Sequence, residues 1–319
     1  MHLRLIVPPE RTGRVLDTLV ADDRLTSVVL LPAAALRPAG DVIECDVTRE
    51  AASDVLSWLK DQGLYDDGAV ALTAVDAAPS RNARETERAA PGAPDDAVIW
   101  DAVVDQAYNE VGGSWAYYTF LTLATMIAAV AVVTDSAILV VGAMVVGPEF
   151  GVVAALALGL ALDKRGLTYR AFLLLLKGFA LAILVTALFA LLARAVGWID
   201  AGDVTAARPL TGFIWRPDRW SVVVAVLAGC AGVLSQTAGR SNALVGVFIS
   251  VTTVPAAGDL ALSTAVWAPQ QIAGSAAQLG INLAGMTLAG VATLLLQRTI
   301  WRAFARHSAK PDDSQVTVQ

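Results

Sequence analysis

The sequence predicts an α-helical integral membrane protein of six spans with a small α+β domain at its N-terminus. Of its 319 residues, 56% are hydrophobic and 16% are charged, and the mean hydropathy is +0.59. Soluble proteins carry about 25% charged residues, so this composition indicates a membrane protein. Two patterns divide the chain: strands and amphipathic helices alternate in the first 78 residues, and long apolar windows follow from residue 114 onward.

Residues 1–78 have the periodicity of a compact α+β domain. The pattern is βαββαβ, the ferredoxin-like order, in which two split βαβ units share one antiparallel sheet. The first helix carries Val15, Leu16, Leu19 and Val20 on one face, the second carries Val55, Leu56 and Leu59, and Gly63 is expected to end the second. We expect strands at 2–7, 27–33, 41–47 and 69–75 and helices at 11–23 and 50–63.

Residues 79–96 are rich in Pro, Ala and charge without apolar periodicity, which predicts a linker. Residues 97–111 predict an amphipathic helix with an acidic polar face, which argues against adhesion to anionic lipid. We expect this helix to pack on the soluble domain or on a neighbouring subunit. The soluble domain is expected to be a regulatory or oligomerising module, with a small-molecule sensor as the alternative, because this fold hosts all of these roles.

The membrane domain is expected at 112–298, followed by a tail at 299–319. An even number of spans puts both termini on one side, and Lys and Arg gather in the connections on that side, while the opposite loops hold Arg208, Arg216 and Arg219. The positive-inside rule then predicts cytoplasmic termini in the cell membrane. Each apolar window is near or above the roughly 20 residues that a span requires. The windows are 114–133, 136–161, 168–196, 220–237, 242–262 and 271–297.

Two of these windows contain a proline near their middle, Pro148 and Pro255. Proline removes a helix hydrogen bond, and such breaks persist in membranes only where protein or a watery cavity satisfies the freed groups. The broken windows are the middle members of two trios, which predicts a 3+3 inverted repeat of the kind found in transporters. The alternative is that both prolines merely kink ordinary spans.

Glu149 follows Pro148 at the expected depth of the membrane midplane, where a charged carboxylate costs at least about 2.5 kcal/mol. It is expected to bind a cation or exchange a proton, or alternatively to cap the N-terminus of a half-helix. Asp259 is expected either deep in the membrane or at its outer edge, and Asn282, like Gln278, either cross-links helices or lines a path. The candidate path comprises Gly147, Pro148, Glu149, Ser250, Thr252, Thr253, Pro255, Asp259 and Asn282.

The segment ILVVGAMVVGPEFGVVAALALGLALDKR, the later SNALVGVFISVTTVPAAGDLAL and the final INLAG together resemble a family of hydrophobic membrane domains called domain of unknown function 389. Members similarly pair a glycine- and proline-containing element with a later VPP-like element and an asparagine in the last span. The resemblance covers about residues 96–297 and implies fold and topology, with no activity attached. This chain departs from the pattern with Glu149 where a small or apolar residue is common, and with Ala256 where a second proline is common.

Enzyme chemistry has little support in the sequence. The two histidines, His2 and His307, lie near opposite ends, and no phosphate-binding or dinucleotide-binding motif occurs, so we expect no cofactor and no metal site. A carboxylate pair of Glu149 with Asp259 is conceivable. The net charge of −6 argues against nucleic acid as a partner. We expect a transporter or channel for a small solute or ion that contacts lipid and forms a homo-oligomer, or alternatively a membrane scaffold or ligand sensor.

Overall fold

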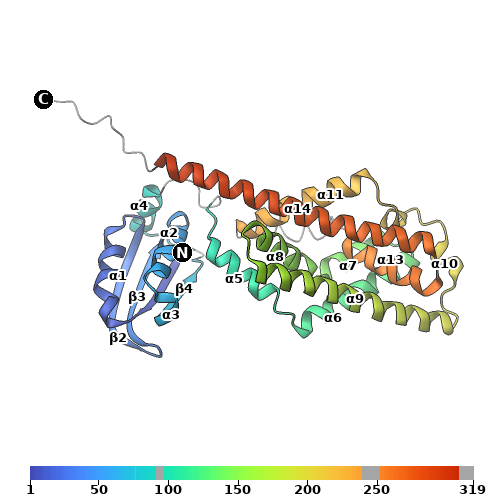
Figure 1. Cartoon of the computed structure of the whole chain (residues 1–319), viewed down its shortest axis with the longest axis horizontal. Coiled ribbons are helices and arrows are strands. Elements are labelled where there is room, and N and C mark those ends of the chain that lie inside the picture. The colour runs from blue at the N-terminus through green and yellow to red at the C-terminus, as the bar shows by residue number, and fades with distance from the viewer. Residues whose placement is uncertain (76, 91–96, 239–251, 309–319) are drawn as a thin grey trace. The chain divides into compact units, whose positions relative to one another are not determined.

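The computed structural model describes residues 1–75, 77–90, 97–238 and 252–308, and for residues 301–308 only the helical backbone. The chain forms two compact units, Met1–Val103 and Val104–Gln319. Figure 1 shows the first as a sheet with its helices and the second as a helical bundle. Each unit is described separately.

The first unit contains one four-stranded antiparallel sheet with strand order β2-β3-β1-β4. The central strand β1 pairs with β3, with Leu5 opposite Ile43, and with β4, with Leu5 opposite Val70. The predicted βαββαβ order is confirmed, with one short extra helix before the last strand. The elements are β1 (His2–Val7), α1 (Pro9–Ala21), β2 (Leu25–Leu36), β3 (Ala39–Val47), α2 (Arg49–Asp61), α3 (Leu64–Asp67) and β4 (Ala69–Thr73).

One face of this sheet packs against the helices, as the alternating burial of β1 shows. Leu3 and Leu5 of β1 join Val15 and Leu19 of α1 in the core. Val20 is 64% exposed, so its predicted place on the inward face of the helix is wrong. Helix α1 begins at Pro9, earlier than predicted, because proline suits the first helical position. Gly63 has φ +75° just after α2, and it ends that helix as predicted.

Residues 81–89, within the segment predicted as linker, form helix α4 (Arg81–Ala89). Ser80 caps this helix by accepting a hydrogen bond from the Ala83 N–H. The following segment, 97–99, is tied to α2, since Arg49 donates to the Ala97 carbonyl and Ser53 donates to the Val98 carbonyl. Helix α5 (Trp100–Glu110) then occupies most of the predicted amphipathic segment.

The second unit is helical. Among its described residues, four helices are long and apolar enough to cross a membrane, and the α7–α8 pair, bent by 55°, makes up to five spans. The elements are α6 (Trp115–Val133), α7 (Ala137–Val146), α8 (Glu149–Ala161), α9 (Arg165–Ala195), α10 (Ala201–Thr205), the 3₁₀ helix η2 (Gly212–Trp215), α11 (Arg219–Thr237), α13 (Thr253–Val266) and α14 (Pro269–Ser308).

These spans coincide with five of the six predicted windows. The remaining window, 242–262, lies partly outside the described residues, and its described part falls in α13, which has 14 residues. Six spans therefore stay a prediction. Helix α13 packs against α6, α9 and α14 inside the bundle, as Figure 1 indicates. Gly258 permits this contact, because a Cβ there would lie 2.8 Å from the Ala129 nitrogen of α6.

Candidate functional site

The predicted break at Pro148 is present between α7 and α8. Gly147 closes α7 by donating its N–H to the Ala143 carbonyl and then adopts an extended conformation, as a residue before proline prefers. Pro148 lacks an N–H and occupies the N-cap of α8, which begins at Glu149. The break therefore places Glu149 at the first position of a new helix inside the bundle.

The first residues of α8 and α13 are joined by a hydrogen bond. Thr253 Oγ1 donates to Glu149 Oε1 at 2.6 Å, and the two residues are 1% and 6% exposed. A helix N-terminus carries about half a positive charge, so two positive helix ends lie at one carboxylate. The capping role and a binding role for Glu149 are both compatible with this position.

The second carboxylate oxygen of Glu149, Oε2, is buried and has no hydrogen-bond partner in the described part of the chain. It lies over Gly147, where a Cβ would collide with it and with the Val254 side chain. A side chain at 147 would therefore displace the Glu149 carboxyl group or the Val254 side chain. An acceptor oxygen left free in a buried site is the atom that can take a proton or an ion.

Thr252, adjacent to Thr253, links the same place to α14. Its Oγ1 accepts hydrogen bonds from Gln278 Nε2 at 3.1 Å and from Asn282 Nδ2 at 3.0 Å. Gln278 and Asn282 are each 2% exposed. The amides therefore connect α14 to the start of α13, and they extend the polar surface that begins at Glu149.

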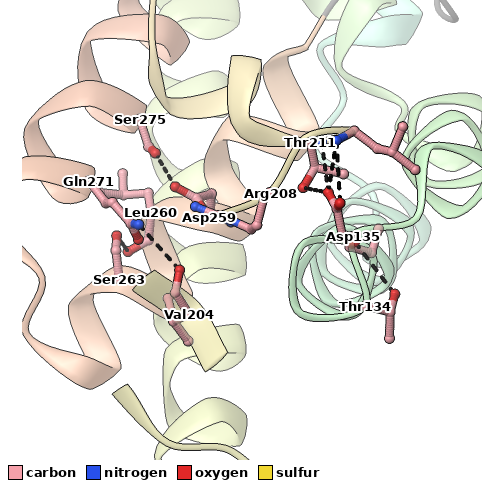
Figure 2. Close-up of polar contacts among 12 residues, drawn as sticks. Thr134, Asp135, Val204, Arg208, Thr211, Asp259, Leu260, Ser263, Gln271 and Ser275 are labelled. Carbon is pink, nitrogen blue, oxygen red and sulfur yellow. Dashed lines mark hydrogen bonds and ion pairs between the residues drawn. The ribbon is translucent and has the colours of Figure 1, made fainter. Parts of the chain in front are cut away.

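Asp259, six positions after Thr253 on α13, has its own set of partners. Arg208 Nη1 donates to its Oδ1 at 2.6 Å, and Ser275 Oγ donates to its Oδ2 at 2.5 Å. The side chains of Arg208 and Asp259 are 3% and 0% exposed. Figure 2 shows Arg208 reaching Asp259 from the segment that follows α10. Asp259 is thus buried within the protein, and its depth in the membrane stays a prediction.

Four polar side chains form a line on α14, which we call the α14 polar stripe: Gln271, Ser275, Gln278 and Asn282. All four are buried, at 5%, 0%, 2% and 2% exposure, and their spacing places them on one helix face. Gln271 Nε2 donates to the Val204 carbonyl (Figure 2), and the other three bind α13 or its N-cap. The stripe covers about 16 Å of helix, roughly half of a bilayer core.

The structure thus brings some of the predicted path residues together and leaves others apart. Glu149, Thr253, Thr252 and Asn282 meet, with Gly147 and Pro148 shaping the break. Asp259 is held apart from Glu149 by its own partners. Pro255 is buried in the first turn of α13, where a missing N–H is tolerated, and the half of its window that precedes α13 lies outside the described residues. Ser250 also lies outside them.

Two further residues lie at the first turn of α8, one beside Glu149 and one on the opposite side of the helix, and neither stands out in the sequence. The Glu110 carboxylate, at the end of α5, lies against Gly151, two residues after Glu149 on α8, with Cδ 2.8 Å from the position of a Cβ there. Partial burial of the carboxyl raises the pKa of Glu110, although the residue is exposed by its accessible surface. Tyr117 of α6 is close enough to interact electrostatically with Glu149, and its hydroxyl has no partner among the described residues.

Arg208, Ser275 and Gln271 were also missed as site residues. In the sequence, Arg208 counts only as one of the basic residues of a loop between two predicted spans. Nothing in its sequence neighbourhood signals burial. The helical spacing of the polar residues on α14, in contrast, is visible in the sequence and signals a polar helix face. In the part of the chain that the structure describes, no three His, Cys, Asp or Glu side chains are grouped as metal ligands.

A family model matches the part of the chain that contains the site. No curated protein and no solved structure matches the chain. The matched region runs from the end of α7 to the middle of α14, and it contains Glu149, Thr252, Thr253, Asp259 and Asn282. Residues 144–288 match the family model described as Domain of unknown function (DUF389), which is the family that the sequence resembles.

Proposed function

We propose that this protein is a membrane transporter or channel for a small solute or ion, with its path between the N-termini of α8 and α13. The observation that carries the proposal is the hydrogen bond from Thr253 to Glu149, which joins the first residues of two helices at a buried carboxylate with one free oxygen. Broken helices whose ends point at an intramembrane site are the usual construction of secondary transporters.

The α14 polar stripe supports the same path. Burying an amide or hydroxyl costs free energy unless it is hydrogen-bonded, and polar residues within spans are uncommon away from sites and helix contacts. Here the stripe runs from Gln271 to Asn282 and ends at Thr252, beside the Glu149 site. Gln278 Oε1 and Gln271 Oε1 are buried acceptors without partners among the described residues, and they are available to a passing solute or to water.

The proposal includes a topology. Six spans in two inverted trios place α8 and α13 at corresponding positions, each beginning inside the membrane domain. Lys164, Arg165 and Arg170 lie on the inner side, so both termini are cytoplasmic and the protein resides in the cytoplasmic membrane. The N-terminal unit then faces the cytoplasm, where it regulates the path or assembles subunits into a homo-oligomer.

Flux into proteoliposomes tests the proposal. Radiolabelled sodium, potassium, chloride and acetate serve as probes, with protein-free liposomes as the baseline. We expect flux of at least one probe above that baseline, and a strong reduction in Glu149→Gln combined with Thr253→Val. Gly280→Ala is the matched control, because a Cβ at Gly280 meets no atom within 4 Å. Flux that is unchanged by the double substitution contradicts the assigned path.

A further inference from the structure

The two buried carboxylates of the membrane unit have opposite surroundings. Asp259 has both oxygens hydrogen-bonded, one by the Arg208 guanidinium and one by Ser275. Glu149 has a neutral hydroxyl on one oxygen and no partner on the other among the described residues. A cation compensates the charge of Asp259, whereas no side-chain cation from the described residues is bound to Glu149. Environments that separate two carboxylates in this way identify the one that can change its protonation state.

The helices that the structure describes around Glu149 place no cationic side chain at its carboxyl group. Tyr117 and Tyr118 are the titratable residues of α6, α7 has none, and α14 has no charged residue before Arg298. Asp259 of α13 is occupied by Arg208. In the described part of the chain, the charged residues of α9 and α11 all lie on exposed positions: Arg165, Arg170, Lys177, Arg194 and Arg219.

Two effects compete at Glu149. The N-termini of α8 and α13 favour the ionised form, each by about 0.3–1 kcal/mol and at most about 2 kcal/mol. Removing a carboxylate from water without a paired cation costs several kcal/mol. Desolvation therefore prevails while the site is closed and 6% exposed, and a neutral carboxylic acid is the stable form there. Water at the site reverses this balance, because a hydrated carboxylate ionises readily.

We propose that Glu149 is a proton-exchange site, so that transport is coupled to protons. This rests on the proposed path, and it names the coupling ion of that path. When water enters the site, the Glu149 carboxyl releases its proton to that water, and the carboxylate takes a proton back from water before the site closes.

Infrared difference spectroscopy of the full chain in liposomes, titrated with pH, tests the proposal without any solute. We expect a carboxylic acid C=O band that titrates well above the exposed carboxylates and is absent in Glu149→Gln. Asp163→Asn is the matched control, since the Asp163 side chain is 87% exposed and its loss should leave the band intact. Glutamine mimics the protonated acid and can still accept from Thr253, so Glu149→Gln should fold and lose the associated pH dependence of its unfolding temperature.

Glu110→Gln is a second control, because Glu110 lies against Gly151 on the side of α8 opposite to Glu149, and its loss should leave the band intact. A missing Glu149 band at every pH, or a band whose midpoint moves with sodium concentration, overturns the proton site. A third outcome is a titrating Glu149 band together with probe flux that Glu149→Gln does not change. This outcome contradicts the proposed path and supports the proton site, so the two failures are distinguishable.

Discussion

Arg208 and Asp259, which are 51 positions apart in the chain, form a 2.6 Å ion pair whose side chains are 3% and 0% exposed. The arginine comes from the connection between α10 and η2, and the aspartate from α13. Arg208 Nε and Nη2 have no partner in the described residues. The pair therefore fixes that connection to α13 at the cost of two buried donors.

Removal of one partner should destabilise the protein strongly. Arg208→Ala leaves Asp259 buried without its cation, and the expected loss is about 3–5 kcal/mol. Thermal unfolding of the purified protein in detergent should show a clear drop in the midpoint temperature. The double variant Arg208→Met with Asp259→Leu should recover most of that loss, because it removes both charges. Equal midpoints for Arg208→Ala and wild type would show that the pair is open in the membrane protein.

The hydroxyl of Thr253 should matter more than its methyl group. Thr253→Val removes the donor to Glu149 Oε1 and is expected to cost about 0.5–1.5 kcal/mol if the acid is neutral, and about 1.5–3 kcal/mol if it is ionised. Thr253→Ser keeps the donor and should retain most of the stability. The difference between the two variants, measured as unfolding temperature at several pH values, reports the hydrogen bond. Identical behaviour of the two variants would contradict it.

The contact between α11 and α14 should tolerate no side chain at Gly229. A Cβ there would lie 2.8 Å from the Met286 Cα and 2.5 Å from its carbonyl oxygen, so backbone atoms would have to move. We expect Gly229→Ala to cost about 1–3 kcal/mol. Gly280→Ala on α14 is the control, because its Cβ meets nothing within 4 Å. Unfolding temperatures of the two variants that agree with each other would rule out this close packing.

Cys45 should be inert in the folded protein. Burial raises the pKa of its thiol to about 12, so the reactive thiolate is scarce at pH 8. Maleimide should label Cys45 in a Cys230→Ser background only after unfolding, where the thiol pKa is about 8.5. Because the folded pKa is the higher one, the contribution of Cys45 to stability is complete below about pH 8.5 and is lost as the pH rises toward about 12. Rapid labelling at pH 8 without denaturant would contradict this burial.

The sequence predicted what depends on local pattern. The window 114–133 corresponds to α6, and the break at Pro148 is present, because apolar length and a missing proline N–H act within a few residues. The Glu149 position at a helix start follows from the same local rule. Helix α4 was missed although its signals were present: Ser80 at the N-cap, and Arg81 and Glu85 at a spacing that forms a 2.7 Å ion pair.

Tertiary partners could not be predicted in the same way. Asp259 was left at two possible depths because its environment depends on Arg208, a residue from a connection between helices. Glu110 belongs to the acidic face of a predicted amphipathic helix, and its contact with Gly151 of α8 is visible only in the structure. Such contacts depend on how separate helices pack together. The spacing of residues within one helix gives no information about that packing.

The most direct test of the path is the accessibility of single cysteines at positions 149 and 253, in a background lacking Cys45 and Cys230. Membrane-impermeant thiol reagents are applied from each side of the membrane in turn. The control is a cysteine at Ala131, a fully buried residue in the apolar cluster around α6. We predict labelling at Glu149→Cys and Thr253→Cys from at least one side and protection at Ala131→Cys. Protection of all three positions from both sides would contradict a water-accessible path and favour a membrane scaffold or sensor.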